Sequence, residues 1–307
     1  MTDHLVFSGN PLDRASNLRH DPNWVASQLA ADESRYLVFS GLNVMAQPAN
    51  PAHLVWLEAP SWRPLAENGT QPLLLGVQNG VAHFAVDLPP DLSTLPRFDG
   101  AEFADVRGIA PALSADEGGI VAQARALIDW HSRHRFCGVC GSSTMVQKAG
   151  SSRRCEGCGK EHFPRTDPVV IMVVWREDRC LLGRRSGRPG AAYSCLAGFI
   201  DQGETIEEAV RREAMEEAGA LVDEVVYHTS QPWPFPSQLM IGCFAHATTD
   251  EIKVDELELT DVGWFTREQV RPALAGMSRD LTLPGSIAIA HHLISDWCER
   301  RHPLFAS

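Results

Sequence analysis

The sequence lacks a long hydrophobic run and a leader-like beginning. It has no stretch of about 20 apolar residues, so it offers no candidate for a membrane-spanning helix. The first residues carry no basic segment followed by an apolar one. We therefore expect a cytoplasmic protein with no membrane partner.

Positive charge is also scarce. The chain has 27 Lys and Arg residues against 39 Asp and Glu residues, which gives a net charge of −12. Affinity for nucleic acid comes mainly from neutralising phosphates, so this balance disfavours non-specific binding to nucleic acid. An anionic substrate would need a local cationic site.

Cysteines are few, and half of them are scattered. The chain of 307 residues is long enough to bury two or three cores without disulfides. We expect Cys180, Cys195, Cys243 and Cys298 to be small apolar residues in a reducing compartment.

The other four cysteines form two C-x2-C pairs separated by fourteen residues: Cys137 with Cys140, and Cys155 with Cys158. Free thiols or two disulfides are the alternative interpretations. This spacing is typical of a tetrahedral zinc site, and paired knuckles of this kind favour zinc. All four positions would be filled by protein, so we expect a structural zinc ion.

The chain divides around this zinc ribbon. Before it, residues 36–46 and 53–58 are strand-like, and residues 73–88 predict a hairpin with Asn79-Gly80 at its turn. Ser114 and Glu117 resemble a capping box ahead of apolar residues at helical spacing. We expect a small α+β domain without a catalytic cluster over residues 1–130, the ribbon over 131–165 and a third domain over 166–307.

The third domain contains a short glutamate-rich helix. Thr205 and Glu208 form a capping box and Gly219 is a natural helix stop, so residues 206–218 should be helical. At about 100° per residue, with the first helical residue at zero, Ala209 and Val210 fall at about −60° and about +40°. They define the inward-facing stripe of the helix.

Three carboxylates continue this stripe in the second half of the helix. On the same scale Glu213, Glu216 and Glu217 fall at about −20°, about −80° and about +20°. Glutamates on a helix usually form a solvated face, but here that face would be the one that packs, and isolated buried carboxylates are costly. Mg²⁺ or Mn²⁺ prefers carboxylate oxygens and keeps some waters. The pattern therefore favours a divalent metal site.

The segment resembles the Nudix box, Gly-x5-Glu-x7-Arg-Glu-aliphatic-x-Glu-Glu-x-Gly. Its fixed positions are Gly198, Glu204, Arg212, Glu213, Glu216, Glu217 and Gly219. Ala214 and Ala220 depart from the pattern, because larger aliphatic residues are usual there. The resemblance implies an α+β protein whose third domain is a Nudix α/β/α sandwich with a mixed sheet.

A second motif narrows the resemblance. Ser230-Gln-Pro-Trp-Pro-Phe-Pro236 is similar to the signature of NADH pyrophosphatases, which also carry a four-cysteine ribbon followed by aromatic-Pro-Arg, here Phe163-Pro164-Arg165. The serine that ends the signature would fall at position 238. This sequence has Gln238 there and Ser237 one place early, so it departs from the signature at the end of the loop.

The resemblance assigns roles to individual residues. The divalent ions would be held by Glu213, Glu216, Glu217, Glu258 and the main-chain carbonyl of Ala197. Arg212 would orient Glu204 or a ligand carboxylate. The substrate would be contacted by Phe163, Phe199, Gln231, Pro232, Trp233, Pro234, Phe235, Pro236, Ser237, Gln238 and Ala288, with Arg107 reaching a phosphate.

The implied reaction is hydrolysis of NAD(H) to NMN(H) and AMP, with Mg²⁺ or Mn²⁺ for catalysis and Zn²⁺ for structure. RNA with a 5′-terminal NAD contains the same bond and would give NMN and a 5′-monophosphate. Water, deprotonated by a carboxylate, would attack one phosphorus in line, with Glu217 as the first candidate base and Glu213 or Glu258 as alternatives. The resemblance also suggests a homodimer.

Two other functions remain open at this point. One is hydrolysis of ADP-ribose or another nucleoside diphosphate by a Nudix enzyme. The other is a non-catalytic regulator that binds nucleotide or nucleic acid through its ribbon, against which the complete carboxylate set and the acidic charge argue.

Overall fold

The computed structural model describes residues 5–66, 70–89, 100–185 and 190–305, and the chain divides into two compact units. The first unit comprises Met1–Thr166 with Trp233–Ser237, and the second comprises Asp167–Pro232 with Gln238–Ser307. The ribbon thus shares a unit with the N-terminal part of the chain. The predicted limits of three separate domains stay predictions.

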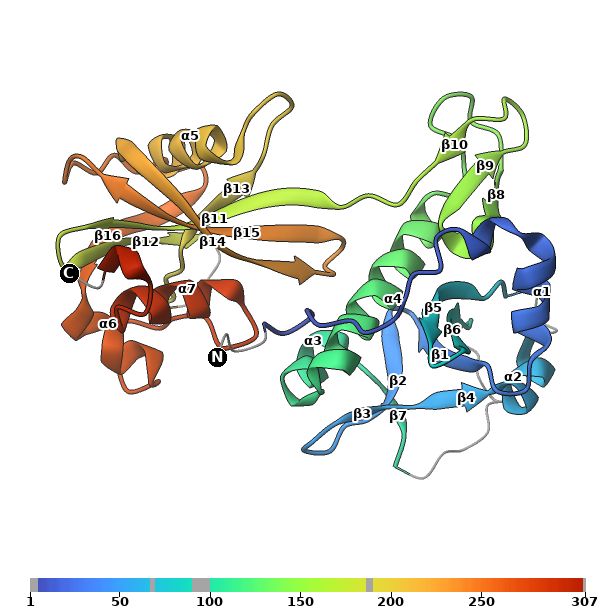
Figure 1. Cartoon of the computed structure of the whole chain (residues 1–307). Coiled ribbons are helices and arrows are strands. Elements are labelled where there is room, and N and C mark those ends of the chain that lie inside the picture. Colours follow the sequence, from blue (N-terminus) through green and yellow to red (C-terminus); the bar gives the residue numbers. More distant parts are fainter. Residues whose placement is uncertain (1–4, 67–69, 90–99, 186–189, 306–307) are drawn as a thin grey trace. The chain divides into compact units, whose positions relative to one another are not determined.

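A mixed sheet forms the centre of the first unit (Figure 1). Its main path runs β3 (His53–Leu54), β2 (Asn43–Gln47), β1 (Arg35–Ser40), β6 (Val81–Asp87) and β5 (Leu73–Gln78), while β4 (Trp56–Glu58) pairs with β1 and β7 (Glu102–Ala104) pairs with β2. Strands β1 and β6 are parallel. The predicted hairpin is confirmed as β5 and β6, with positive φ of 53° at Asn79 and 80° at Gly80. The expected strand-like run 36–46 divides at Gly41 and Leu42, which also have positive φ.

The long helix α4 (Ala115–Arg133) packs on strands β5 and β6 of this sheet. The shorter helices of the unit are α1 (Pro22–Ala30), α2 (Ala59–Ala66) and α3 (Val106–Ile109), with 3₁₀ turns η1 (Leu18–His20) and η2 (Ala110–Ala112). The predicted capping box of α4 forms only in part. The N–H of Glu117 donates to the Ser114 hydroxyl at 3.3 Å, but the Glu117 carboxylate accepts the N–H of Leu54 at 2.8 Å.

The ribbon is a three-stranded antiparallel sheet of β8 (Thr144–Gln147), β9 (Ser152–Cys155) and β10 (Glu161–His162), with η3 (Lys148–Gly150) between the first two. Buried Arg153 ties it to α4. The guanidinium of Arg153 donates to the Thr144 hydroxyl at 2.7 Å and to Nδ1 of His131 at 3.1 Å. Burial lowers the pKa of His131 to about 4, so this imidazole is neutral and can accept that hydrogen bond.

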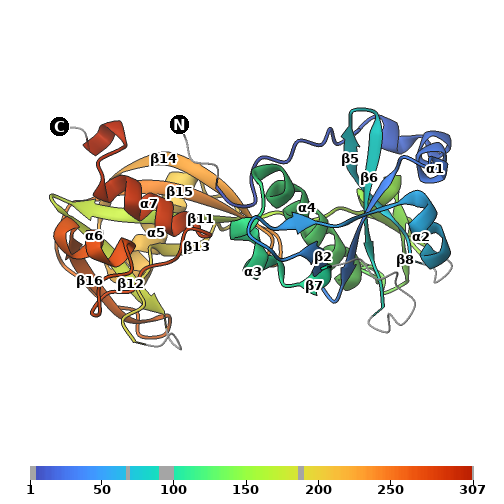
Figure 2. The ribbon, with the colours of Figure 1, turned by 90° about the horizontal axis from the view of Figure 1, so that it is seen from below.

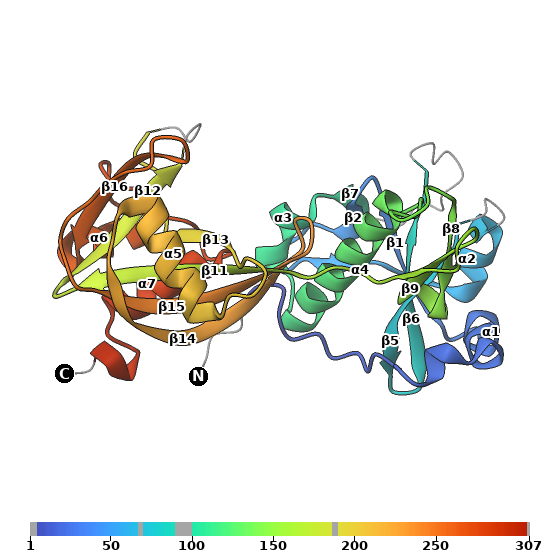
Figure 3. The same cartoon turned by 90° about the horizontal axis from the view of Figure 1, so that it is seen from above.

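The second unit is the expected α/β/α sandwich. Its sheet order is β14 (Val222–Trp233), β15 (Gln238–Ala247), β11 (Asp167–Arg176), β12 (Arg179–Arg185) and β16 (Leu259–Thr266), and β13 (Leu196–Phe199) also pairs with β11. Strands β11 and β15 are parallel, whereas β12 and β13 are antiparallel to β11. Helix α5 (Ile206–Ala218) covers one face (Figure 3). The other face carries α6 (Arg267–Leu274) and α7 (Ile289–Cys298), and η4 (Pro303–Phe305) follows (Figure 2).

Helix α5 begins and ends as predicted. The Thr205 hydroxyl accepts the N–H of Glu208 at 3.2 Å, and the Glu208 carboxylate accepts the N–H of Thr205 at 2.7 Å. Gly219 ends the helix with a φ of 67°, in the left-handed region. Among the described residues, no helix combines the length and the apolar character that crossing a membrane requires.

Candidate active site and zinc site

The buried face of α5 carries two of the three predicted carboxylates. Ala209 and Val210 are fully buried, and Glu213 and Glu217 are only 8% and 2% exposed. The prediction is wrong for Glu216, whose side chain is 59% exposed. On the same helical scale Glu216 falls at about −80°, beyond Ala209 at about −60°, so its side chain lies at the edge of the stripe and leaves the interface with the sheet.

Burial disfavours the charged form of both inward carboxylates. Burial raises the pKa of Glu217 to about 7, although the nearby Arg185 and a hydrogen bond from the N–H of Ala197 oppose the shift. Burial also raises the pKa of Glu213, against the effect of Arg212. The charge of Glu258 adds to both shifts. Oxygen donors that are desolvated in this way fit a hard divalent cation.

Gly198 on β13 provides the space for Glu213. A Cβ atom at position 198 would lie 1.9 Å from Cδ and Oε1 of Glu213. The absence of a side chain at this position therefore lets the carboxylate lie directly against the strand. Steric exclusion therefore explains why glycine is needed at this first position of the Nudix box, since the φ of Gly198 is not positive.

We expect Gly198→Ala to displace the Glu213 carboxylate and to lower kcat/KM roughly 10- to 100-fold, since a shift of about 1 Å in a catalytic group can cost this much. Steady-state kinetics would measure the loss. Gly138→Ala is the matched control, because a Cβ there meets nothing within 4 Å. Equal activity of the two variants would contradict this role for Gly198.

Arg212 binds several carboxylates of the site. Its Nε and Nη2 donate to the two oxygens of Glu204 at 2.6 and 2.7 Å, and its Nη1 donates to Glu213 at 2.7 Å and to Glu216 at 3.1 Å. The Arg212 hydrogen bonds lower the pKa of Glu204 to about 2. Arg212 therefore holds the carboxylates of this region in fixed relative positions.

Arg185, at the end of β12, was not indicated by any sequence motif. Its Nη2 donates to the carbonyl of Ala197 at 2.8 Å and lies 3.8 Å from Oε1 of Glu217. These are two of the oxygen groups predicted to bind a divalent ion. Among the described residues, this guanidinium is the cation that pairs with Glu217.

A divalent ion would have to compete with Arg185 for these oxygens. We expect Arg185→Gln to raise the affinity for Mn²⁺ by about 2- to 5-fold, a modest factor because the Arg185 side chain is 60% exposed and its ion pair is screened by solvent. Titration of free Mn²⁺ by electron paramagnetic resonance would measure it. Arg211→Gln, an exposed change on α5, should leave the affinity unaltered. A weaker Mn²⁺ affinity in Arg185→Gln would show that Arg185 does not compete.

The described part of the chain contains one group of side chains whose ligand atoms already lie together, and it is not the glutamates. The four cysteine sulfurs Cys137, Cys140, Cys155 and Cys158 lie within 4.8 Å of one another. Cys137 and Cys155 are buried. Hydrogen bonds led by the N–H of Ser142 lower the pKa of Cys140 to about 6, which favours a thiolate. This donor set fits a zinc ion with no open position.

Gln231 and Ala288, both predicted to line the nucleotide pocket, are neighbours in the second unit. The Gln231 side chain is buried; its Nε2 donates to the carbonyl of Ile287 and its Oε1 accepts the N–H of Ile289, both at 2.8 Å. These two bonds hold the chain on either side of Ala288 at the start of α7. Gln231 thus fixes the position of Ala288 through the backbone.

Residues 231–238 form what we call the aromatic and proline loop. Its tip, Trp233–Ser237, packs within the first unit. The rings of Trp233 and Phe235 meet Phe7 edge-on, with centroids 5.9 and 5.7 Å from it. Arg107 and Arg125 place their guanidinium carbons 4.3 and 4.4 Å from the centroid of Phe235. Arg125 also donates to the carbonyl of Pro234. Arg107 therefore contacts the loop, and neither Phe7 nor Arg125 was singled out from the sequence.

The remaining predicted residues fall into two groups. Phe163, 59% exposed, lies in the first unit with Arg107 and the segment 233–237. Phe199, 54% exposed, lies in the second unit with the glutamates, and its carbonyl accepts a hydrogen bond from Arg212 at 2.9 Å. Pro232 and Gln238 flank the tip of the loop in the second unit. Contacts of these residues with substrate stay predictions.

Three families match consecutive parts of the chain. Residues 33–130 match the NADH pyrophosphatase-like rudimentary NUDIX domain, residues 132–163 match the NADH pyrophosphatase zinc ribbon domain, and residues 165–283 match the NUDIX domain. The zinc ribbon predicted from the cysteine spacing is thus confirmed. So is the Nudix domain predicted from the box.

Relatives that match most of the chain agree with these family matches. The NAD-capped RNA hydrolase NUDT12 of Macaca fascicularis is 38% identical over 95% of this chain and 72% of its own length. The NAD-capped RNA hydrolase of Schizosaccharomyces pombe is 33% identical over 95% of this chain and 93% of its own. The NAD-capped RNA hydrolase NudC of Mycobacterium bovis is 41% identical over 65% and 67%. With these relatives and three matching families in order, the chain belongs to the NADH pyrophosphatase group of Nudix hydrolases.

Proposed function

We propose that this enzyme hydrolyses the pyrophosphate bond of NAD(H) to give NMN(H) and AMP. We also propose that it removes the NAD cap of RNA to leave NMN and a 5′-monophosphate. The observation that carries the proposal is the buried pair Glu213 and Glu217 on α5, with Glu213 seated against Gly198 and the pKa of both carboxyl groups raised by burial. The names of the relatives as NAD-capped RNA hydrolases support the substrate.

The residues proposed to hold divalent ions are Glu213, Glu216, Glu217, Glu258 and the carbonyl of Ala197. A divalent ion bound there would neutralise charge developing on the pyrophosphate oxygens and acidify water. The preferred ion, Mg²⁺ or Mn²⁺, is part of the proposal, as is structural Zn²⁺ on the four cysteines.

The protein groups then have distinct tasks. Glu217, whose pKa is raised to about 7 by burial, would take the proton of the attacking water. Arg212 holds Glu213 and Glu204 in position. The loop 231–238, Phe163 and Phe199 would bind the nucleotide, and Arg107 would reach a phosphate or hold Phe235 in place. We also propose a cytoplasmic location, from the cysteine usage, and a homodimer, from the resemblance to this group of enzymes.

Product analysis in ¹⁸O-labelled water tests the proposal directly. NADH, ADP-ribose and NAD-capped RNA should be compared under the same Mn²⁺ or Mg²⁺ concentration, with chromatography of the products. We expect NMNH and AMP from NADH, with ¹⁸O in one of the two phosphates. Faster cleavage of ADP-ribose than of NADH would favour a general nucleoside diphosphate hydrolase. Binding of NAD(H) without turnover would point to a regulator.

A further inference from the structure

The ribbon carries a charge opposite to that of the rest of the protein. Residues 131–165 contain seven Lys and Arg residues and two Glu residues, whereas the remainder of the chain has 20 Lys and Arg against 37 Asp and Glu. The basic residues are Arg133, Arg135, Lys148, Arg153, Arg154, Lys160 and Arg165. Four thiolates and one zinc ion would subtract two charges, which leaves the ribbon positive. It is the local cationic region that an acidic protein needs in order to bind a polyanion.

The two faces of the ribbon sheet differ in exposure around Arg154. Met145 of β8 pairs with Arg154 of β9, which in turn pairs with Glu161 of β10, so these three side chains form one row on the same face. Met145 is 52% exposed and Arg154 is exposed. Arg153, the next residue, points to the opposite face and is buried against α4. The row of Met145 and Arg154 is therefore open to solvent, whereas Ser152, two residues before Arg154 on the same face, is buried.

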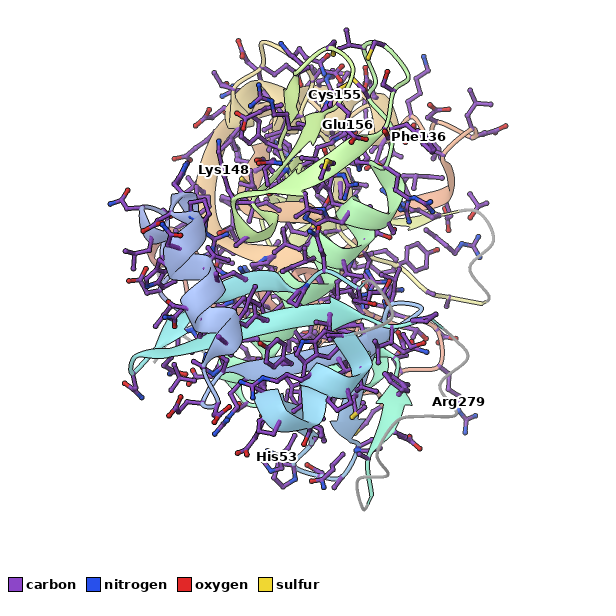
Figure 4. The ribbon with its side chains drawn as sticks, turned by 90° about the vertical axis from the view of Figure 1, so that its right-hand side faces the viewer. His53, Phe136, Lys148, Cys155, Glu156 and Arg279 are labelled. Atoms are coloured by element: carbon purple, nitrogen blue, oxygen red, sulfur yellow. The ribbon has the colours of Figure 1, made fainter. Side chains whose placement is uncertain are left out.

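Two exposed aromatic residues border this row. Phe136 bridges Ser143, two residues before Met145, which places it at the β8 end of the same face, and it is 67% exposed. Phe163, two residues after Glu161, is 59% exposed, with the amine of Lys148 5.7 Å from its ring centroid. Phe136 and Lys148 are labelled at opposite ends of the ribbon in Figure 4. We call Phe136, Met145, Lys148, Arg154 and Phe163 the ribbon face.

The cations around this face differ in their partners. Lys148 is paired with Glu161 at 2.9 Å. Arg154, Lys160 and Arg135 are exposed, and none of them forms an ion pair with a residue in the described ranges. Exposed aromatic rings together with exposed cations are typical of surfaces that bind single-stranded nucleic acid, where bases stack and phosphates meet Lys or Arg.

We propose that the ribbon face binds the RNA chain that follows the NAD cap, as a single strand, through base stacking and phosphate contacts. This rests on the proposed function, and it assigns the RNA part of the substrate to residues outside the catalytic carboxylates. Phe163 is itself proposed to line the nucleotide pocket. The ribbon face thus shares one residue with the proposed nucleotide-binding set, and the nucleotides after the cap would run from Phe163 across the ribbon sheet toward Phe136.

The test compares two substrates with three variants. Phe136→Ala and Arg154→Gln change exposed side chains that have no part in the catalytic machinery. Arg63→Gln on α2 is the matched control, because α2 lies in the same unit but at the end opposite the ribbon (Figure 4). Kinetics on NADH and on a single-stranded NAD-capped RNA of about 20 nucleotides would be measured with each.

We expect Phe136→Ala and Arg154→Gln to lower kcat/KM on NAD-capped RNA by roughly 5- to 100-fold, mainly through KM, since one stacked base contributes about that factor. Their kcat/KM on NADH should stay unchanged, as should both values for Arg63→Gln. For Arg154→Gln the slope of log KM against log salt should also fall by about 0.7, the value for one lost phosphate contact on a single strand. Fluorescence anisotropy of 5′-monophosphate RNA should show the same loss of affinity.

Other outcomes would overturn the inference. An equal loss on NADH and capped RNA would make the changes structural, and no loss on RNA would exclude contact with it. A change in sedimentation mass with no change in RNA selectivity would make the ribbon face a contact between copies of this chain. If the wild-type protein cleaves neither substrate, the proposed function fails; if it cleaves both and the variants do not discriminate, only the ribbon face fails.

Discussion

Glu217→Gln is expected to lower kcat on NADH by at least about 10³-fold, because the change removes both a general base and a charged metal ligand. The substitution keeps the size of the side chain and its hydrogen-bonding capacity, so the fold should survive. In the wild type, burial makes the carboxylate form of Glu217 costly and raises its pKa to about 7. A neutral amide at this position carries no such cost. The variant should therefore be at least as stable as the wild type in the presence of a chelator.

The matched control is Glu207→Gln, the same chemical change at an exposed position of the same helix. Rates on NADH would be measured with Mn²⁺ and Mg²⁺, and melting temperatures with and without Mn²⁺. Mn²⁺ should raise the melting temperature of the wild type and of Glu207→Gln by mass action, and should raise that of Glu217→Gln much less. A Glu217→Gln variant that keeps activity within about threefold of wild type would exclude Glu217 as base and as essential ligand.

Local features of the site could be predicted from the sequence because local rules determine them. The limits of α5 follow from the Thr205 and Glu208 capping box and from Gly219, whose contacts span only a few residues. The burial of Glu213 and Glu217 follows from helical periodicity alone. Glu216 shows the limit of that rule. It lies at the edge of the stripe, so its burial depends on how wide a surface covers the helix, which periodicity does not predict.

Contacts between distant segments left no signal in the sequence. Arg185 reaches Glu217 because β12 runs next to the strands that α5 covers, and nothing in the residues near it reveals this. Gln231 was predicted as a substrate contact, yet both ends of its amide bind the backbone around Ala288, fifty-seven positions later. A motif shows that such a residue matters to the family, but only the fold shows what it touches.

The aromatic and proline loop has a local motif that the sequence shows and distant contacts that it does not show. Its motif identified the group of enzymes, and its rings were expected to present stacking surfaces. In the structure, Phe7, Arg107 and Arg125 pack around Trp233 and Phe235. These three partners come from sequence positions more than 100 residues earlier, so no spacing rule relates them to the loop. The rings are therefore held in place by the first unit, whatever part of them meets substrate.

Cys155→Ser is expected to remove zinc from the ribbon and to lower the melting temperature by on the order of 10 °C, because structural zinc contributes directly to folding and each kcal/mol lost shifts the midpoint by about 2–4 °C in a chain of this size. Cys155 is 2% exposed and lies 3.4 Å from the sulfur of Cys140. Without the ion, sulfurs at this spacing repel one another as thiolates. Arg153 of the ribbon donates a buried hydrogen bond to His131 of α4. Loss of order in the zinc-free ribbon would therefore also destabilise α4 and the sheet on which it packs.

Metal content by mass spectrometry and thermal unfolding by circular dichroism would measure both effects. Cys195→Ser is the matched control, since Cys195 is a buried cysteine of the second unit remote in sequence from the knuckles. It should keep one equivalent of zinc, and any loss of stability there would reflect packing alone. If Cys155→Ser keeps its zinc, or loses it without a drop in melting temperature, the ribbon does not depend on the ion for its fold. In that case the four sulfurs would have to be explained as free thiols, which their mutual distances and the buried positions of Cys137 and Cys155 disfavour.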